Sequence, residues 1–481
     1  MTKKFFITTA IDYVNAKPHI GHAYEKILTD VVARFHRLKG EDVKFLTGTD
    51  ENAQKNAQAA NEKGIPTQEF VDKNSQYFID LCKVLNISYD EFIRTTQKKH
   101  IKKSQEIFKK VYDKGDIYKG KYEGHYCEGC ESFITEKELV NGKCPEHNKE
   151  PKLISEEAYF FKLSKYKNKL LKLFESGLVI PKTKSNEMVS RLKEEGLRDL
   201  NVSRTNLNWG INSPIDKDFK IYVWFDALIN YISGSGKNEE YWPADCHVVG
   251  KGINWFHSVI WPAMLLSAGY KPPKNIWVHG YLTVNKQKIS KSLGNAIDPI
   301  ELTKKYPVDS IRYFLIREIP FENDGDFSEQ ILIERHNNEL ANKLGNLISR
   351  TTTLAEKYGI TKTENKLLKK LKLKQIEKHL DNYELDKALN EIFNFIDLCN
   401  EYIQNKKPWE TKDTKVLYEL IDSIKAIAIL LYPFIPETSE KIVKNLDFKI
   451  DYKNINKPLT TKTIKKSEIL FKKIEVQEAL N

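Results

Sequence analysis

Residues 5–47 decide the fold of this chain, and they read FFITTAIDYVNAKPHIGHAYEKILTDVVARFHRLKGEDVKFLT. Residues 5–9 are aromatic and β-branched, which predicts a β-strand. A helix is predicted over residues 22–38, because one face is apolar at spacings of three and four residues: Ile27, Val31, Phe35 and Leu38. Residues 43–47 form the next predicted strand after the helix-ending Gly40. A strand, a helix and a second strand in this order open a parallel α/β sheet.

The same texture continues along the chain. Helices are predicted at residues 67–85 and 97–114. Strand-like apolar runs return at residues 221–225, 247–250 and 276–279, and we expect them to complete the parallel sheet.

Four segments are predicted. Residues 1–114 and 222–336 are the two halves of the sheet domain, and residues 115–221, which surround a cysteine cluster, are an insertion. Strand signals vanish after the sheet domain, and apolar residues at helical spacing predict an all-α bundle over residues 337–481. A final packed helix is expected near residues 467–478.

Composition and charge limit the class of protein. With 481 residues, 40% hydrophobic and 30% charged, the chain is long enough for two to four folded units. No apolar run approaches the roughly 20 residues that cross a bilayer, and the N-terminus reads as a strand rather than a signal peptide. We therefore expect a cytoplasmic protein without a membrane partner. The net charge of +11 fits a polyanionic partner, but a general abundance of surface lysine gives the same excess.

The tetrapeptide His19-Ile20-Gly21-His22 lies between the first strand and the first helix. Unpaired N–H groups and the helix dipole favour an anion at a helix N-terminus. Gly21 leaves room for a base or phosphate beside the backbone, and the two imidazoles can donate hydrogen bonds to phosphate oxygens. The alternative is an ordinary surface turn.

A second polar motif is Lys288-Ile289-Ser290-Lys291-Ser292, just past the strand that ends near His279. Two lysines on a loop can close over a triphosphate and neutralise charge that develops during phosphoryl chemistry. Alone, such a loop is more commonly a solvated surface. Both motifs at the same end of one sheet favour a nucleotide site.

A metal site is predicted from the pattern Cys127-x2-Cys130-x13-Cys144-x2-His147. Three thiolates and one imidazole at this spacing form a closed tetrahedral zinc set, so we expect one structural Zn²⁺ and no open position for catalysis. The alternative is a chance cluster of reduced thiols. The other cysteines are isolated and are expected to be small buried residues: Cys82, Cys246 and Cys399.

The two phosphate motifs resemble the HIGH and KMSKS signatures of the class I aminoacyl-tRNA synthetases, and the surrounding residues resemble the methionyl-tRNA synthetases. Nearly the whole chain is covered, with matching stretches at residues 10–13, 45–51, 223–228 and 279–284 besides the cysteine cluster. The resemblance implies a Rossmann-like α/β catalytic domain, a zinc-binding insertion of the one-zinc type, and a C-terminal helical bundle that binds the anticodon.

The activity implied by the resemblance is the ATP-dependent activation of methionine, with Mg²⁺, to methionyl-adenylate. Transfer to the 3′-terminal adenosine of tRNA(Met), including initiator tRNA, follows. Catalysis of such a reaction rests on positioning and charge stabilisation. The resemblance implies the following ATP-binding residues, of which the histidines and lysines are also catalytic: His19, Gly21, His22, Lys288, Ser290 and Lys291.

The same resemblance implies a methionine pocket, and a thioether prefers aromatic edges. Its implied residues are Ala10, Ile11, Tyr13, Asp50, Trp224, Ala227, Leu228, Tyr231 and His279. Asp50 is expected to pair with the substrate ammonium, and Tyr13 and His279 to approach the sulfur. Taken singly, each aromatic residue would be read as core packing.

Three residues of the helical segment match the anticodon-reading positions of the family. Asn346 and Arg350 lie four apart on one predicted helix face, and Trp409 is expected to be exposed in a loop. A Trp can stack on a splayed base and an Arg can bond base edges. The chain ends at Asn481 without a β-rich tRNA-binding extension, from which we expect a monomer.

Two positions depart from the family pattern. Asp50-Glu51 is followed by Asn52 and Ala53 where the family has His-Gly, and Gly250-Lys251 is followed by Gly252 where the family has Asp. That carboxylate would orient the substrate amine or the adenosine side. Slower adenylate formation than in relatives with the aspartate is therefore expected, with Gly252→Asp as the test.

Two other readings compete. A cysteinyl enzyme would need a zinc-binding cysteine just before the first motif, and residues 8–10 contain none. The leucine, isoleucine and valine enzymes carry a large editing insertion, for which residues 115–221 leave no room. A non-catalytic tRNA-binding scaffold usually loses one phosphate motif, and both motifs are present. Methionine-dependent ATP–pyrophosphate exchange separates the enzyme from the scaffold.

Overall fold

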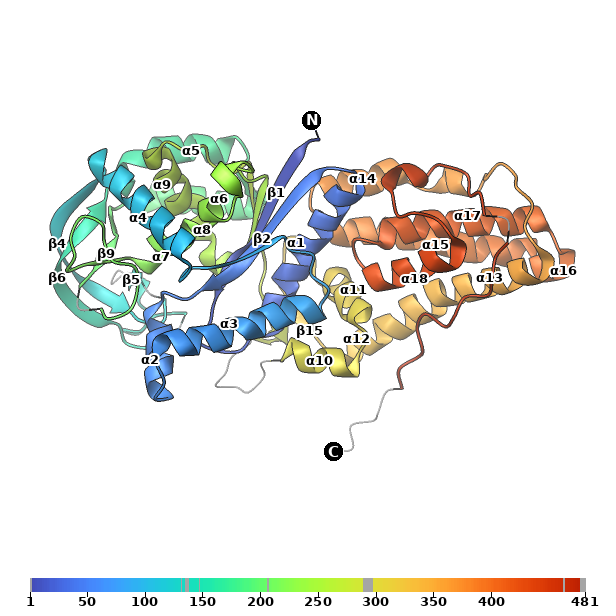
Figure 1. Cartoon of the computed structure of the whole chain (residues 1–481), viewed down its shortest axis with the longest axis horizontal. Coiled ribbons are helices and arrows are strands. Elements are labelled where there is room, and N and C mark those ends of the chain that lie inside the picture. The colour runs from blue at the N-terminus through green and yellow to red at the C-terminus, as the bar shows by residue number, and fades with distance from the viewer. Residues whose placement is uncertain are drawn as a thin grey trace.

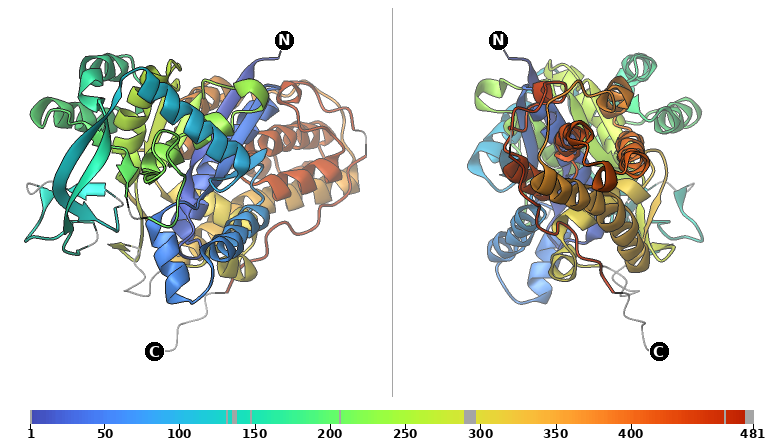
Figure 2. Two further views of the ribbon diagram at one scale, coloured as in Figure 1. Left: turned by 60° about the vertical axis from the view of Figure 1, so that its left-hand side comes forward. Right: turned by 90° about the vertical axis from the view of Figure 1, so that its right-hand side faces the viewer.

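The computed structural model describes residues 2–130, 132–134, 138–146, 148–205, 207–288, 297–461 and 463–475. A parallel sheet and its helices form the middle of the molecule (Figure 1). The β-rich insertion and the helical domain lie at opposite ends, in Figure 1 and again in the rotated views of Figure 2. Among the described residues no helix combines the length and the apolar character that a membrane span needs.

The central sheet has six parallel strands in the order β3-β2-β1-β11-β12-β7. Its strands are β1 Lys4–Tyr13, β2 Asp42–Asp50, β3 Glu91–Arg94, β7 Val179–Ile180, β11 Cys246–Gly250 and β12 Asn275–His279. The strand order reverses between β1 and β11, and in such sheets ligands bind in the crevice at the carboxyl ends of the strands beside this point.

Helices cover both faces of the sheet. Helix α1, Ile20–Leu38, connects β1 to β2 as predicted, and its buried face packs on Phe5, Ile7 and Phe45. The other helices of this part are α2 Gln54–Glu62, α3 Thr67–Val84, α4 Lys98–Asp113, α5 Lys167–Glu175, α6 Lys182–Glu194, α7 Val223–Leu228, α8 Asn230–Ser233 and α9 Trp261–Ala268.

The predicted strand at residues 221–225 is wrong. β10, Lys220–Ile221, pairs with β9, Ser203–Arg204, outside the main sheet, and the residues from Val223 form α7. Every residue of α7 is buried, and a continuous apolar run does not distinguish a buried strand from a buried helix. The sheet is completed instead by β3 and β7, two short edge strands that the sequence analysis did not predict.

The insertion is built on an antiparallel sheet of order β5-β4-β6-β8. Its strands are β4 Ile117–Cys127, β5 Ser132–Ile134, β6 Lys152–Phe161 and β8 Leu200–Asn201. β7 belongs to the same predicted segment but pairs with β12 of the main sheet, so part of residues 115–221 packs against the sheet domain.

Behind the sheet, the chain enters the helical domain through a small sheet of β13 Leu282–Val284, β14 Gln287–Lys288 and β15 Gly325–Phe327. The helices that follow are α10 Pro299–Lys305, α11 Val308–Glu318, α12 Glu329–Arg335, α13 Asn346–Tyr358, α14 Leu373–Asp381, α15 Leu385–Lys406, α16 Pro408–Thr411, α17 Thr414–Leu431 and α18 Pro436–Leu446. The predicted all-α character is confirmed for the described residues after 337. One apolar core runs without a break from α1 through α11 to α15 and α17.

The predicted helix near residues 467–478 is also wrong. The described part, up to residue 475, is extended and lies along α13 and the π-helical turn before it. Ser467 N donates to Thr352 Oγ1 at 3.1 Å, and Ile474 N donates to Asn337 Oδ1 at 2.9 Å. Side chains of the helical domain therefore satisfy this backbone, which needs no helical ladder of its own. Residues 476–478 lie outside the described residues.

Candidate active site

The first motif is a helix cap made of two imidazoles. His19 is the N-cap of α1, where Gly21 N donates to His19 Nδ1 at 3.1 Å and His19 N donates to His22 Nδ1 at 3.0 Å. Each Nδ1 is an acceptor, so each neutral ring carries its proton on Nε2. The rings stack at 3.8 Å, and a Cβ on Gly21 would lie 2.9 Å from His19 Cε1. The cap thus places two ring N–H donors at a helix N-terminus, which is favourable for an anion.

The described chain is anchored on both sides of the second motif. Lys288 closes the β13–β14 hairpin through its backbone pairing with Thr283. Ser290 and Lys291 lie outside the described residues. The chain returns at Ile297, whose carbonyl accepts a 3.0 Å hydrogen bond from Ile20 N in the first turn of α1. Both ends of the lysine-bearing loop are therefore fixed, one of them directly to the histidine motif.

A small cavity opens at the carboxyl end of β1. It gathers all the predicted methionine-pocket residues except His279: Ala10, Ile11, Tyr13, Asp50, Trp224, Ala227, Leu228 and Tyr231. Three further residues line it that the sequence analysis did not predict: Asn230, Ile253 and His257. His279 is buried outside this lining, with its Nε2 3.0 Å from Glu25 Oε2.

One wall of this cavity is aromatic. The Trp224 ring stacks on Phe256 with centroids 3.8 Å apart and an angle of 9°, and Tyr13 meets Trp224 edge-on at 6.3 Å. Such paired rings present a large apolar surface. Two buried polar atoms of lining residues have no hydrogen-bond partner among the described residues, Trp224 Nε1 and Asn230 Oδ1.

The lining also contains a hydrogen-bonded Tyr–His pair. Tyr231 Oη lies 2.8 Å from His257 Nε2, and His257 Nδ1 lies 2.9 Å from the Ile253 carbonyl oxygen. A carbonyl only accepts, so Nδ1 carries the proton and Nε2 accepts from the Tyr231 hydroxyl. Burial lowers the pKa of His257 to about 4, which keeps the ring neutral and this pattern fixed. The phenol oxygen therefore offers the cavity lone pairs.

Asp50 stands at the end of β2 and is 3% exposed. Its Oδ1 accepts from Asn52 N at 3.2 Å. Asn52 Nδ2 donates to Asp226 Oδ2 at 2.7 Å, and His100 Nε2 lies 2.6 Å from Asp226 Oδ1. The asparagine that replaces the family histidine is thus part of a buried polar network that holds the Asp50 turn.

A second small cavity is lined by Asn52 and Arg204. The guanidinium carbon is 4.3 Å from the centre of the Tyr222 ring and 5.1 Å from that of Tyr126. A cation held between two aromatic faces is suited to a carboxylate or a phosphate. Arg204 was not predicted, because an isolated arginine in a two-residue strand belongs to no motif.

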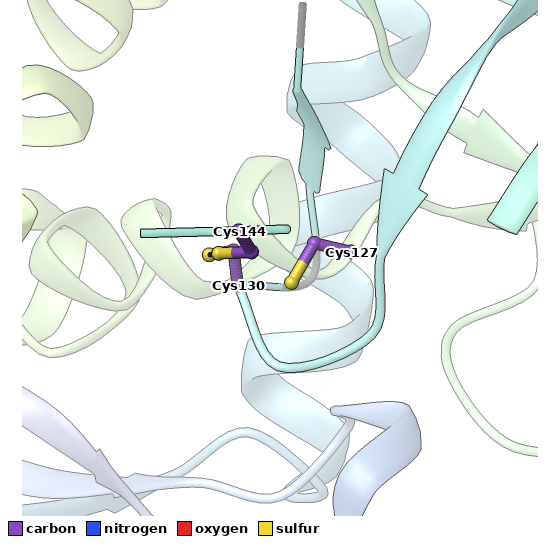
Figure 3. Close-up of side chains that lie close together, drawn as sticks. All are labelled: Cys127, Cys130 and Cys144. Atoms are coloured by element: carbon purple, nitrogen blue, oxygen red, sulfur yellow. Dashed lines mark hydrogen bonds between the residues drawn. The ribbon is translucent and has the colours of Figure 1, made fainter. Parts of the chain in front are cut away.

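Three cysteines converge in the insertion (Figure 3). The sulfur atoms of Cys127, Cys130 and Cys144 all lie within 4.8 Å of one another, with Cys130 and Cys144 at 3.5 Å. Burial and the neighbouring thiols raise the pKa of Cys130, so a cation is needed to hold the set as thiolates. The donor set fits Zn²⁺, which prefers thiolate and imidazole ligands. The predicted fourth ligand, His147, lies outside the described residues.

The predicted anticodon residues lie on two adjacent helices. The Arg350 guanidinium of α13 is 5.4 Å from the centre of the Trp409 ring of α16. Asn346 is exposed one turn earlier on α13. Trp409 is half-buried on a one-turn helix rather than exposed in a loop, because Pro408 begins that helix.

Comparison with known families agrees with the fold and the motifs. A family model described as "tRNA synthetases class I (M)" matches residues 5–152 and 138–352, and one described as "Anticodon-binding domain of tRNA ligase" matches residues 365–479. The fold and the matched domains are those of a class I aminoacyl-tRNA synthetase.

Individual relatives narrow the class. The methionine–tRNA ligase of Caldanaerobacter subterraneus is 45% identical over 513 residues, covering 100% of this chain and 80% of that protein. That of Thermotoga maritima is 44% identical, covering 99% and 81%. The structure of Mycobacterium tuberculosis methionyl-tRNA synthetase in complex with methionyl-adenylate superposes with a TM-score of 0.93 at 37% identity, covering 98% of this chain and 100% of that one. The chain belongs to the methionine–tRNA ligase family.

Proposed function

We propose that this chain activates methionine with ATP and transfers the methionyl group to tRNA(Met), the initiator included. The observation that carries the proposal is the cavity at the end of β1. It brings together the aromatic wall, Asp50 and the Tyr231–His257 pair. It opens beside the strand that leads into the two-histidine cap of α1. An amino-acid pocket and an anion site thus share one crevice.

The cavity suits a methionine side chain. Trp224, Phe256 and Tyr13 supply apolar and polarisable surface, and a thioether is favourable beside aromatic edges. The Tyr231 hydroxyl donates its proton to His257, so it is not a donor for a polar side chain in the cavity. A site of this kind rejects polar isosteres by leaving their groups unpaired.

The charged ends of the substrate meet charged protein groups. We assign the methionine ammonium to Asp50, and the methionine carboxylate to the side of Arg204, whose cavity also contains Asn52. The phosphates of ATP, with the Mg²⁺ that accompanies them, accept hydrogen bonds from the Nε2–H groups of His19 and His22. The Nδ1 atoms of these rings already accept hydrogen bonds in the cap.

Adenylate formation then follows from positioning. A carboxylate oxygen of methionine attacks the α-phosphorus of ATP, a new P–O bond forms, and pyrophosphate leaves with the electron pair. Charge on the leaving group is neutralised by Lys288 and Lys291, whose loop is tied to the first turn of α1 through Ile297. The terminal adenosine hydroxyl of tRNA next attacks the methionyl carbonyl, and AMP leaves.

The remaining parts serve the tRNA and the fold. The Arg350–Trp409 pair and Asn346 are proposed to read anticodon bases by stacking and edge contacts. One Zn²⁺ on the cysteine cluster and His147 would stabilise the insertion. The described cavity and anticodon residues lie in one chain, so a monomer suffices, and translation places the reaction in the cytoplasm.

Amino-acid-dependent ATP–pyrophosphate exchange across the twenty amino acids tests the first step. Exchange with methionine alone is expected, followed by charging of a tRNA(Met) transcript but not of a transcript with an altered anticodon. Exchange with a different amino acid would overturn the methionine assignment. No exchange by zinc-replete protein would overturn the enzymatic one.

A further inference from the structure

Glu25 lies next to the lining of the amino-acid cavity and contacts two other elements at this edge of the sheet. It belongs to α1, three residues after the two-histidine motif, and is 8% exposed. Its Oε1 accepts a 2.9 Å hydrogen bond from Ala10 N of β1, and its Oε2 lies 3.0 Å from His279 Nε2 at the end of β12. One buried carboxylate thus joins α1, β1 and β12 beside the cavity that Ala10 lines.

Ala10 takes part in this contact because β1 is irregular at its position. The pairing of β1 with β11 ends at Thr9, and the register of β1 with β2 shifts between Thr8 and Ile11. Neither neighbouring strand has a residue in register with Ala10. Buried backbone groups need partners, and Glu25 Oε1 supplies an acceptor for the Ala10 N–H. The Ala10 carbonyl oxygen accepts from the Thr9 hydroxyl at 2.6 Å, so side-chain hydrogen bonds hold both polar groups of the Ala10 backbone.

The His279 ring has both of its nitrogens in use. Its Nδ1 lies 2.8 Å from the Gly280 carbonyl oxygen, which only accepts, so Nδ1 carries a proton. Its Nε2 faces Glu25 Oε2, and the hydrogen bond between these two atoms contains a second proton. Tyr24, which is 2% exposed, meets the ring edge-on at 5.3 Å and fixes its plane. Neither nitrogen is left for a ligand, in agreement with the place of His279 outside the cavity lining.

Ala10 is the part of this arrangement that reaches the cavity. Ile11 and Tyr13 follow it on the same strand and also line the cavity, and Tyr13 is in register with Asp50 of β2. A shift of the Ala10 backbone would therefore move one wall of the cavity relative to Asp50, to which the methionine ammonium is assigned. Misplacement by about 1 Å is enough to weaken the productive binding of a substrate.

We infer that Glu25 is a positioning residue for methionine, which holds the Ala10 backbone through Oε1 and is itself held by His279 through Oε2. This role rests on the proposed function and adds a residue that does not line the cavity. His279 then acts on the substrate through Glu25 and not by contact with the sulfur, which replaces the expectation for this histidine. Glu25 is needed for its two hydrogen bonds, so a side chain that keeps both of them can take its place.

The experiment compares Glu25→Met with Glu25→Gln in methionine-dependent pyrophosphate exchange. Glu25→Met is expected to raise KM for methionine about ten- to a hundredfold, because a buried N–H loses its acceptor. KM for ATP should change by less than about twofold, since the histidine cap of α1 is closed by its own hydrogen bonds. Glu25→Gln keeps an acceptor for Ala10 and gains a donor for the neutral His279 ring, so KM for methionine should stay close to the wild-type value. Glu62→Met, at an exposed glutamate of α2, is the matched control with no expected effect.

His279→Leu separates positioning from direct contact with the sulfur. Norleucine, which has a methylene in place of the sulfur, serves as a competitive inhibitor of the exchange reaction. His279→Leu should raise KM for methionine and the inhibition constant of norleucine by the same factor, because a displaced wall affects both side chains. In the Glu25→Met background His279→Leu should add nothing, since the pair is already broken.

Four results would overturn the inference. The first is a larger loss for methionine than for norleucine in His279→Leu, which would place the imidazole on the sulfur, and the second is additive losses in the double variant. The third is an unchanged KM for methionine in Glu25→Met, or a rise that KM for ATP shares equally. The fourth is a loss in Glu25→Gln as large as in Glu25→Met, which would assign the effect to charge. If Glu25→Met does not fold, the norleucine comparison in His279→Leu decides alone. Absence of methionine-dependent exchange in the wild type would instead refute the proposed function.

Discussion

At the scale of single residues, the cavity depends on the hydrogen bond between Tyr231 and His257, whose direction is set by a backbone carbonyl. Ile253 O fixes the proton of His257 on Nδ1, and this makes the Tyr231 hydroxyl the donor to Nε2. His247 is a second buried histidine that packs against this pair. Its Nε2 accepts from Trp261 Nε1 at 3.2 Å, and its ring stacks on Tyr231 at 4.1 Å. The proton of the Tyr231 hydroxyl is thus used within the protein and is not offered to the substrate.

His257→Leu tests this arrangement. The substitution leaves the buried Tyr231 hydroxyl without its acceptor, at a cost of about 1–3 kcal/mol. KM for methionine in pyrophosphate exchange should rise about tenfold, and discrimination against polar analogues should fall. Tyr231→Phe added to His257→Leu should recover part of the loss, because the unpaired hydroxyl is removed. Additive losses in the double variant would contradict the proposed pairing.

The same histidine predicts a pH dependence of stability. The imidazole titrates near pH 6.5 in an unfolded chain and at about 4 when buried here. Between these values the unfolded chain binds more protons, so the free energy of unfolding falls as pH drops through this window, by about 3 kcal/mol in full. Above pH 6.5 the contribution is constant. Urea unfolding at pH 7 and 4.5 should show a smaller pH effect for His257→Gln than for the wild type. Equal pH effects in the wild type and in His257→Gln would contradict the assignment of this pH dependence to His257.

At the scale of elements, the sequence predicted best where periodicity and motif coincide. α1 and the two-histidine motif were predicted because a 19-residue amphipathic helix follows a strand. α7 was mistaken for a strand because its residues are buried on every side, and the extended C-terminal segment was mistaken for a helix because its partners, Thr352 and Asn337, are more than a hundred residues away in sequence. His257 and Arg204 were not predicted as site residues for a similar reason, since their roles arise only from contacts that folding creates.

The insertion makes a prediction about metal. Purified wild-type protein should contain about one Zn²⁺ per chain, and Cys144→Ser should contain close to none, because a closed site needs all its ligands. Metal analysis measures this directly. Cys399→Ser, at a buried cysteine of α15 far from the cluster, is the control and should retain its zinc. Full zinc content in Cys144→Ser would exclude the cluster as the metal site.

At the scale of the whole molecule, the catalytic and helical domains are joined by a buried ion pair. Arg312 of α11 is fully buried and contacts Asp30 of α1 through Nη2 at 2.7 Å. Its other donors reach the carbonyls of Pro433 and Phe434, between α17 and α18. Arg312 and Arg34 hold the pKa of Asp30 below its usual range, despite its burial. One side chain thus ties the helix of the histidine motif to the domain with the anticodon residues.

Removing only one member of this pair should be far worse than removing both. Arg312→Met leaves the Asp30 carboxylate buried without its main counterion and is expected to lower the free energy of unfolding by about 3–5 kcal/mol. Asp30→Asn added to Arg312→Met should restore part of the loss, because the buried carboxylate is removed; the recovery is incomplete, because Arg34 loses its carboxylate partner and keeps only the amide oxygen as an acceptor. Urea unfolding with a probe in each domain measures both effects.

In the wild type, the two probes should report unfolding at the same urea concentration, since α1, α11, α15 and α17 share one core. Separate transitions in the wild type would show that the pair joins two domains that fold independently.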